Sequence, residues 1–519
     1  MNGEIPCHPK KIKEVILGDK FISINEFVAV ARYGARVTFS QNYCNRVIQS
    51  RNLIEKFLTE NRKIYGVTTG FGENVSKIIS PEQSETLQRN IVRSHAVSVG
   101  EPLKKEVVRA SQLMMLQSFG QGYSGVSLQI LELIRGLLNH HVTPYVPGEG
   151  SVAYLAPEAH MALVLIGEGR AWHKNELLSG KEALERAGLH PITLGCKEGL
   201  SLLNGTSTVT AFSVLAVYDA MTSVKVADIA GAMSLEALKG TIKAFDPRIH
   251  KAKKHKEQAG TARNIVRILE ESEIAEKHKD YRLQDAISLR ALPQMHGAAK
   301  KAIKNALEDI VNEMQSCGDN PIVYPKNGDG VALMTGNFDG TYVGIQADSM
   351  CIAITTLAKV SERRIDRLVN HHHSELPSFL VANPGLNNGY MIPQYTAAGL
   401  YGEMKTLSHP ASIDNVPTCA NQEDAVSFAY FAAKKAYLIT KKLHYILAIE
   451  LMCATQALDF LKPLHPGQVT KAVYDLIRSK VPVVEEDRFF YPDIENIYSQ
   501  VLHGEIIERV EEIIGELEV

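Results

Sequence analysis

The chain has 519 residues, of which 45% are hydrophobic and 22% are charged, and its formal net charge is -2. These fractions are typical of a folded globular protein and exclude a globally disordered or fibrous chain. Acidic and basic residues nearly balance, and no dense basic block with interleaved aromatic residues occurs. Nucleic acid is therefore not expected as a partner.

The cysteines and the apolar segments bear on the cellular compartment. The 7 cysteines are scattered, and none has the Cys-x-x-Cys spacing of a zinc or redox site. Residues 1–20 lack the apolar stretch of a signal peptide, and no run of about 18 uncharged apolar residues predicts a membrane span. We expect a reduced, cytoplasmic protein with no metal ion and no membrane partner.

The chain divides by pattern near residue 202. Residues 1–202 combine short helical patterns with turns rich in glycine and proline, as at 65–72 and 147–150. From residue 203 onward, long apolar-periodic stretches predict long helices that pack against one another. We therefore predict a mainly α protein in which an N-terminal domain, 1–202, precedes a long central and C-terminal helical bundle, 203–519.

Residues 425–461 illustrate the predicted bundle helices. Their periodicity predicts one helix about 50 Å long. The pairs Lys434-Lys435 and Lys441-Lys442 recur after seven residues and predict a solvent-exposed stripe, whereas Leu438 and its apolar neighbours are expected to be buried.

Polar clusters between the long apolar runs are candidates for a shared site. Each cluster by itself is more typical of helix capping, but several together favour a common cavity. The clusters are Asn204-Gly205-Thr206, Gln284-Asp285, Arg290, Gly336-Asn337-Phe338, Gln394-Tyr395 and Asn421-Gln422-Glu423-Asp424.

Three further features each allow two interpretations. The loop Tyr65 to Gly72 is either a mobile lid carrying a phenol that acts as a base or a tight turn with a buried tyrosine. Arg290 is either a surface cation or a bidentate clamp for a carboxylate. Glu423 either caps a helix or is a buried carboxylate that serves a cation. The triplet His371-His372-His373 favours a polar loop over a metal site, because adjacent side chains diverge.

Taken together, the motifs resemble the histidine and phenylalanine ammonia-lyase family over residues 60 to 465. The resemblance rests on Tyr65–Gly72, Leu87–Asn90 with Ser94-His95, Leu203–Thr206, Phe245–His250, Gln284-Asp285 with Ser288–Arg290, Ser361–Arg367 and Asn421–Asp424. It implies a mostly α homotetramer with a central helical bundle and with sites assembled from several subunits. The resemblance also implies a substrate with an imidazole-type ring, because of Glu423, Met391 and His95. Phenylalanine lyases usually carry glutamine at the position of Glu423 and lysine at the position of Met391.

One departure from the family pattern concerns its electrophile. Family members form a methylidene-imidazolone from an internal Ala-Ser-Gly between Gly-Ser-Val and Leu-Ala-Pro. In this chain, Ala153 and Tyr154 alone stand between Val152 and Leu155. The N-terminal domain therefore carries a degenerate cofactor loop, and we expect no cofactor. A second departure is Ile287, where the family pattern places an active-site tyrosine.

Two expectations together indicate the substrate: the electrophile is missing, and the substrate ring is of the imidazole type. They favour a substrate whose amine leaves without activation. A quaternary trimethylammonium group has no N–H proton to lose, so we expect a lyase similar to ergothionase, which releases trimethylamine and thiourocanate from ergothioneine. Three alternatives stay open: elimination from hercynine, deamination of histidine, or a non-catalytic ligand-binding homologue.

The resemblance also implies roles for individual residues in this reaction. The expected catalytic residues are Tyr65 as general base, Arg290 as carboxylate clamp and Glu423 as a contact to the ring. The expected substrate-binding residues are His95, Tyr154, Asn204, Gln284, Phe338 and Met391. Tyr154 and Phe338 are expected to face the methylated cation, since a π-face attracts a cation by about 0.5–2 kcal/mol; Tyr154 equally fits as a filler of the space left by the deletion.

Overall fold

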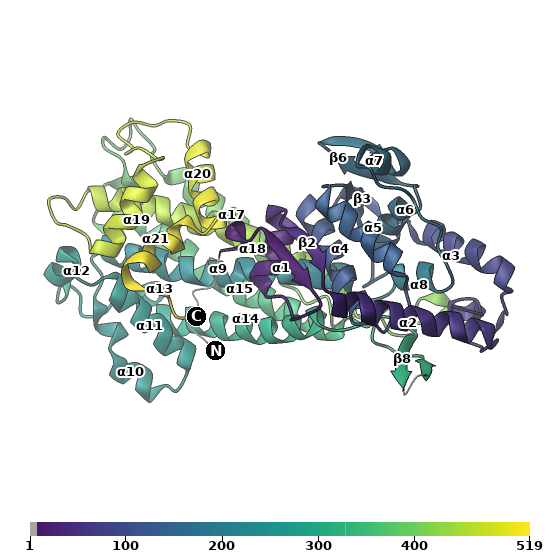
Figure 1. Cartoon of the computed structure of the whole chain (residues 1–519). Coiled ribbons are helices and arrows are strands. Elements are labelled where there is room, and N and C mark those ends of the chain that lie inside the picture. The colour runs from purple at the N-terminus through teal and green to yellow at the C-terminus, as the bar shows by residue number, and fades with distance from the viewer. Residues whose placement is uncertain (1–7, 327–328) are drawn as a thin grey trace. The chain divides into compact units, whose positions relative to one another are not determined.

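The computed structural model describes residues 8–326 and 329–519 of the chain, and helices dominate it (Figure 1). The chain divides into two compact units. Unit 1 comprises residues 1–218, 307–347 and 410–434, and unit 2 comprises residues 219–306, 348–409 and 435–519. The mainly α class predicted from the sequence is confirmed. The domain boundary expected at residue 202 stays a prediction.

Unit 1 contains most of the short elements. Its helices, counting those shared with unit 2, are η1 (Pro9–Lys11), α1 (Ile24–Tyr33), α2 (Gln41–Thr59), η2 (Gly72–Ser76), α3 (Pro81–His95), α4 (Lys105–Gly120), α5 (Leu128–Asn139), α6 (Ala156–Leu165), α7 (Gly180–Arg186), α8 (Glu198–Leu203), η5 (Cys419–Asn421), and parts of α9 (Ser207–Ala237), α14 (Leu292–Met314), α15 (Thr341–Val369) and α18 (Ala429–Asp459).

Among the described residues, the strands of unit 1 form four small sheets. β1 (Glu14–Leu17) pairs in parallel with β2 (Arg36–Phe39), whereas the other pairs are antiparallel. These are β3 (Val99–Pro102) with β5 (Pro147–Glu149), the order β4 (Thr143–Pro144), β6 (Arg170–His173) and β7 (Glu176–Ser179), and β8 (Ile322–Lys326) with β9 (Asp329–Leu333).

Unit 2 is built from helices. Besides the remaining parts of α9, α14, α15 and α18, it contains η3 (Ile242–Phe245), α10 (Pro247–Ala252), α11 (Lys256–Ile268), α12 (Glu273–His278), α13 (Ile287–Arg290), α16 (His371–Ser374), η4 (Ser378–Leu380), α17 (Met391–Leu407), α19 (Gln468–Arg478), α20 (Tyr491–Leu502) and α21 (Glu505–Ile514).

Two local expectations need correction. Lys435, expected on a solvent-exposed stripe, is 1% exposed, and its ammonium donates to Asp348 at 2.7 Å in a buried ion pair. The other three lysines of the stripe, Lys434, Lys441 and Lys442, are partly exposed. Leu438, expected to be buried, is 39% exposed.

The histidine triplet forms the short helix α16 rather than a loop, because Asn370 caps it by accepting from the His372 amide. No group of metal-ligating side chains occurs in residues 8–326 and 329–519.

In the part of the chain that the structure describes, two helical stretches have the length and hydropathy of a membrane span, Glu198–Ala237 and Thr341–Val369. Within their most apolar windows, 94% and 61% of the residues, respectively, are buried inside the protein. Such burial is typical of helices in a protein core, where all faces of the helix contact other elements.

A hydrophobic cluster of unit 1 holds the loop that carries Tyr65. Leu53, Ile54 and Phe57 on one face of α2 pack with Ile64 and Val67 of the following segment and with Val323 of β8. Full burial of one such side chain stabilises the fold by about 1.5–3 kcal/mol. This packing places Ile64 and Val67, on either side of Tyr65, in the hydrophobic core of unit 1.

Candidate active site

Tyr65 is held by the glycine at the far end of its own loop. Its phenol oxygen accepts a hydrogen bond from the Gly72 amide at 2.9 Å. Burial raises the pKa of the Tyr65 phenol, whereas the Gly72 amide opposes that shift because it stabilises the phenolate. Gly72 has φ +53°, and a Cβ there would lie 2.5 Å from Cys419 Sγ, so a glycine is needed for the close approach of the two loops.

Glu423 lies on the loop that contacts Gly72. Its Oε2 accepts hydrogen bonds from Thr418 Oγ1 at 2.8 Å and from Tyr154 Oη at 3.5 Å. Burial and the Glu423 charge raise the pKa of the Tyr154 phenol well above its usual range, so Tyr154 is a neutral donor.

Tyr154 and Phe338 bring a third segment into the cluster. Their rings pack edge to face with centroids 5.1 Å apart, a favourable geometry for an aromatic pair. Tyr154 is 5% exposed, so most of its ring is covered.

His95 ends helix α3 and lies in the electrostatic range of Glu423. Burial lowers the pKa of the His95 imidazole, and the Glu423 carboxylate opposes that shift. One ring nitrogen, Nδ1, is 3.0 Å from Ser94 Oγ. A neutral imidazole beside a carboxylate offers both a donor and an acceptor to a polar ring.

Asn204 follows helix α8, and its side-chain amide donates to the Asn320 carbonyl at 3.0 Å. Gly205 next to it approaches the Gly318 backbone, which also lies near the Asn337 carbonyl. Asn204 is thereby tied to the segment that leads to Phe338.

Unit 1 therefore contains six of the predicted site residues, and five of them are joined by contacts or by electrostatic interaction: Tyr65, His95, Tyr154, Phe338 and Glu423.

Gln284, Arg290 and Met391 belong to unit 2. Within unit 2, Ile287 lines a hollow of about 370 Å³ together with Lys359, Arg363, Arg367 and His373. The Arg290 Nε is buried and has no hydrogen-bond partner among the described residues.

Sequence reasoning missed three supporting groups: Thr418, which holds Glu423, the Gly72 amide on Tyr65, and Cys419 against Gly72. Thr418 and Cys419 closely precede the Asn421–Asp424 motif, so proximity to that motif was the available signal.

The residues of the degenerate cofactor loop do not fit the electrophile that members of the resembled family form there. Ala-Ser-Gly is absent between Val152 and Leu155. Leu155 instead has φ +78° and ψ -70°, and the Ala156 amide donates to the Tyr154 carbonyl at 3.2 Å. This geometry is a γ-turn of positive φ, a rare and strained conformation.

A model of the aromatic amino acid lyase family matches residues 22–479. The chain belongs to this family. Among its relatives, the histidine ammonia-lyase of Symbiobacterium thermophilum is 45% identical over 96% of this chain and 98% of its own length. The histidine ammonia-lyase of Alkaliphilus metalliredigens is 43% identical over 97% of this chain and 100% of its own length.

Solved structures of the family agree with this assignment. Histidine ammonia-lyase from Trypanosoma cruzi superimposes with a TM-score of 0.90 at 36% identity, covering 97% of this chain and 96% of the other. Ergothionase from Treponema denticola superimposes with a TM-score of 0.87 at 27% identity, covering 95% of this chain and 99% of the other.

The expectation of an ergothionase is therefore wrong, since the more similar family members are named histidine ammonia-lyase. This family member is a carbon–nitrogen lyase of the ammonia-lyase type.

Proposed function

We propose that the chain is a histidine ammonia-lyase-like enzyme that eliminates the α-amino group of histidine to leave the unsaturated imidazole acid. The observation that carries this proposal is the grouping of Tyr65, His95 and Glu423. The chain that holds them is 43% and 45% identical, over nearly its full length, to two proteins named histidine ammonia-lyase. A phenol, an imidazole and a carboxylate suit a substrate that carries an acidic β-proton and a polar ring.

The proposed steps use the chain's own residues. Tyr65, as phenolate, removes the β-proton, and the electron pair of that C–H bond forms the new carbon–carbon double bond. The C–N bond breaks, and its electron pair leaves with the amine. Arg290 and Asn204 hold the substrate carboxylate, and His95 and Glu423 hold the ring nitrogens, so that the β-proton faces Tyr65. No step involves the family's electrophile, because the residues at 150–157 do not supply its precursor.

The absent Ala-Ser-Gly favours hercynine, the trimethylammonium betaine of histidine, as a second candidate substrate. An ordinary α-ammonium group loses an N–H proton to a base more readily than the β-carbon does, and the resulting amine is a poor leaving group. The trimethylammonium group of hercynine has no such proton. Tyr154 and Phe338 offer it aromatic faces, each worth about 0.5–2 kcal/mol for a cation.

Separate incubations of the purified protein with histidine and with hercynine test these proposals. Ammonia from histidine, lost in Tyr65→Phe and kept in the matched control Tyr123→Phe, is the expected result. Trimethylamine from hercynine with no ammonia from histidine would overturn the first proposal in favour of the second. Binding of either compound without any released amine would identify a ligand-binding homologue and overturn both.

We further propose that the protein works as a homotetramer. In each active site, Tyr65 comes from one copy of the chain, and Gln284, Arg290 and Met391 come from other copies. Family membership supports this arrangement. Mixing unfolded Tyr65→Phe and Arg290→Met chains and refolding them together is expected to restore activity that neither variant has alone. Inactive mixtures that elute as tetramers would overturn the shared site, and a monomer by light scattering would overturn the assembly.

A further inference from the structure

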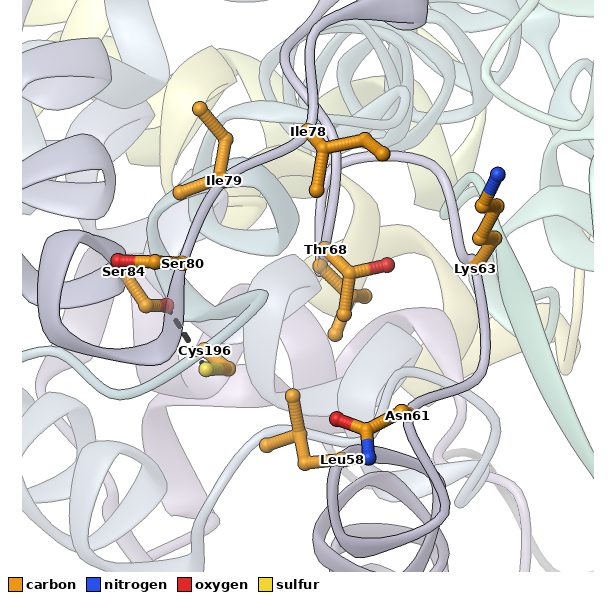
Figure 2. Close-up of a pocket in the computed structure, with 10 residues that line it drawn as sticks. Leu58, Asn61, Lys63, Thr68, Ile78, Ile79, Ser80, Ser84 and Cys196 are labelled. Carbon is orange, nitrogen blue, oxygen red and sulfur yellow. Dashed lines mark hydrogen bonds between the residues drawn. The ribbon is translucent and has the colours of Figure 1, made fainter.

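A cavity of about 220 Å³ lies in unit 1 at the base of the loop that carries Tyr65 (Figure 2). It is formed by the end of α2, by both arms of the segment from residue 63 to 80, by the first turns of α3 and by Cys196. The lining residues are Leu58, Asn61, Lys63, Val67, Thr68, Ile78, Ile79, Ser80, Ser84 and Cys196. None of the predicted site residues lines it.

The two arms that line the cavity are hydrogen-bonded to each other. The Ile79 amide donates to the Thr68 carbonyl at 3.0 Å, and the Gly70 amide donates to the Lys77 carbonyl at 2.9 Å. A bridge between Thr69 and Ile78 completes this small ladder. A molecule in the cavity therefore contacts both arms of the segment that holds Tyr65.

The lining has an apolar part and a positively charged edge. Leu58, Val67, Ile78 and Ile79 supply aliphatic surface, and Figure 2 shows Ile79 and Ser84 across the cavity from Lys63. The described lining residues include no acidic side chain, and Lys63 has no ion-pair partner among the described residues. An aliphatic chain with one negative charge matches this combination.

The size of the cavity limits the ligand further. Pockets for drug-sized molecules measure about 300–1,000 Å³, and this one is smaller. The fit is to a short aliphatic carboxylate.

We propose that this cavity binds a short-chain aliphatic monocarboxylate, with the carboxylate at Lys63 and the chain against Val67 and Ile78, and that occupancy slows the opening of the Tyr65 loop. Binding adds contacts to the closed arrangement of the two arms, so the loop opens less often and kcat falls. The effect on kcat rests on the proposed function, whereas the binding itself does not.

The thiol of Cys196 reports on occupancy, because it lines the cavity and lies 2.7 Å from Ser84 Oγ. The full-length protein is treated with N-ethylmaleimide with and without hexanoate, and alkylation of Cys196 is followed by peptide mass spectrometry. Cys44, which does not line the cavity, is the internal control. At ten times its Kd, hexanoate is expected to slow alkylation of Cys196 about tenfold by mass action and to leave Cys44 unchanged.

Two lysine variants separate the site from a general effect of the fatty acid. Lys63→Gln is expected to lose the protection of Cys196, whereas Lys77→Gln, an exposed lysine of the same segment that does not line the cavity, is expected to keep it. Hexanol at the same concentration is expected to protect less. Equal protection of Cys196 in both variants, or equal slowing at Cys44, would overturn the proposal.

Turnover of histidine or hercynine supplies the second arm of the test. Hexanoate is expected to lower kcat in the wild-type protein and in Lys77→Gln but not in Lys63→Gln. Competition with substrate would place hexanoate in the active site and overturn the lid effect. Absence of turnover with either substrate would instead overturn the proposed function, and protection of Cys196 would still decide the binding.

Discussion

Tyr154 and Glu423 are 269 positions apart in the sequence, yet Tyr154 Oη lies 3.5 Å from Glu423 Oε2. Both residues sit beside strained backbone: Leu155 is in a γ-turn of positive φ, and Cys419, Ala420 and Asn421 all have positive φ. Such conformations cost about 1–3 kcal/mol each and cluster at functional sites. The contact orients the Glu423 carboxylate from one side while Thr418 holds it from the other.

The first prediction concerns Tyr65 as the general base. Tyr65→Phe removes the phenol and is expected to lower kcat about 10²–10⁴-fold, the usual contribution of a positioned base. Because only the phenolate accepts the proton and the pKa of Tyr65 is raised, the wild-type rate is expected to rise with pH across the alkaline range. Tyr123→Phe, whose ring stacks on Tyr324 outside the site, is the matched control. A Tyr65→Phe enzyme with normal turnover would exclude the assignment.

The second prediction concerns the charge of Glu423. Glu423→Gln removes the carboxylate that favours the protonated form of His95 and disfavours the phenolate of Tyr154. The pKa values of both side chains are therefore expected to fall, as measured by an NMR titration. Loss of a hydrogen bond to a charged group, about 1.5–3 kcal/mol, is expected to lower kcat/KM roughly 10- to 100-fold.

Glu73→Gln serves as the control for Glu423→Gln, because Glu73 is an exposed acid on helix η2 of the same loop system. It is expected to leave the His95 titration unchanged. A His95 pKa that shifts equally in both variants, or in neither, would contradict the pairing with Glu423.

The sequence predicted the long helices well because their apolar periodicity is local. The expected helix at 425–461 is α18, Ala429–Asp459. Burial within such a helix was less predictable, since Lys435 is buried by an ion pair with Asp348, 87 positions away. The orientation of Glu423 likewise depends on Thr418 and on Tyr154 from a distant loop, and no spacing rule connects those segments.

The substrate was misassigned for a different reason. The missing Ala-Ser-Gly bears on the electrophile alone and carries no information on the ring that the site binds. The imidazole-type ring was inferred separately, from His95, Glu423 and Met391, and the relatives that are 43% and 45% identical are named histidine ammonia-lyase.

The third prediction concerns the buried pair of Arg364 and Glu450 in unit 2. Both side chains are inaccessible to solvent, with Arg364 Nε 2.5 Å from Glu450 Oε1 and Nη2 2.9 Å from Oε2. Ser234 and Ser361 donate to the same carboxylate. Arg364→Met leaves a buried charge without its cation and is expected to lower the free energy of unfolding by about 3–5 kcal/mol, as measured by urea denaturation.

The double variant Arg364→Met, Glu450→Met removes both charges and is expected to recover most of that loss, because an apolar pair of similar volume carries no desolvation cost. Lys181→Met, which breaks an exposed pair with Glu185, is expected to change the unfolding free energy by less than about 0.5 kcal/mol. A double variant as unstable as Arg364→Met would show that packing, not charge, determines the loss.

The fourth prediction concerns the pH dependence of stability at Glu158, on the first turn of α6. This side chain is 1% exposed, its Oε1 accepts from the Thr208 amide at 3.0 Å, and its Oε2 is buried without a hydrogen-bond partner among the described residues. Burial raises the pKa of the Glu158 carboxyl from 4.5 to about 7. Between these two values the folded chain keeps a proton that the unfolded chain has released.

Stability is therefore expected to fall as pH rises through this interval, because the unfolded state binds fewer protons there. The difference between the two pKa values corresponds to a loss on the order of 3 kcal/mol by pH 8. Glu158→Gln stays neutral and is expected to lack this loss, so that its melting temperature varies less than that of the wild type between about pH 5 and pH 8. Glu185→Gln, at an exposed position, is expected to follow the wild type. Parallel melting curves for Glu158→Gln and the wild type across this pH range would show that Glu158 is ionised in the folded protein.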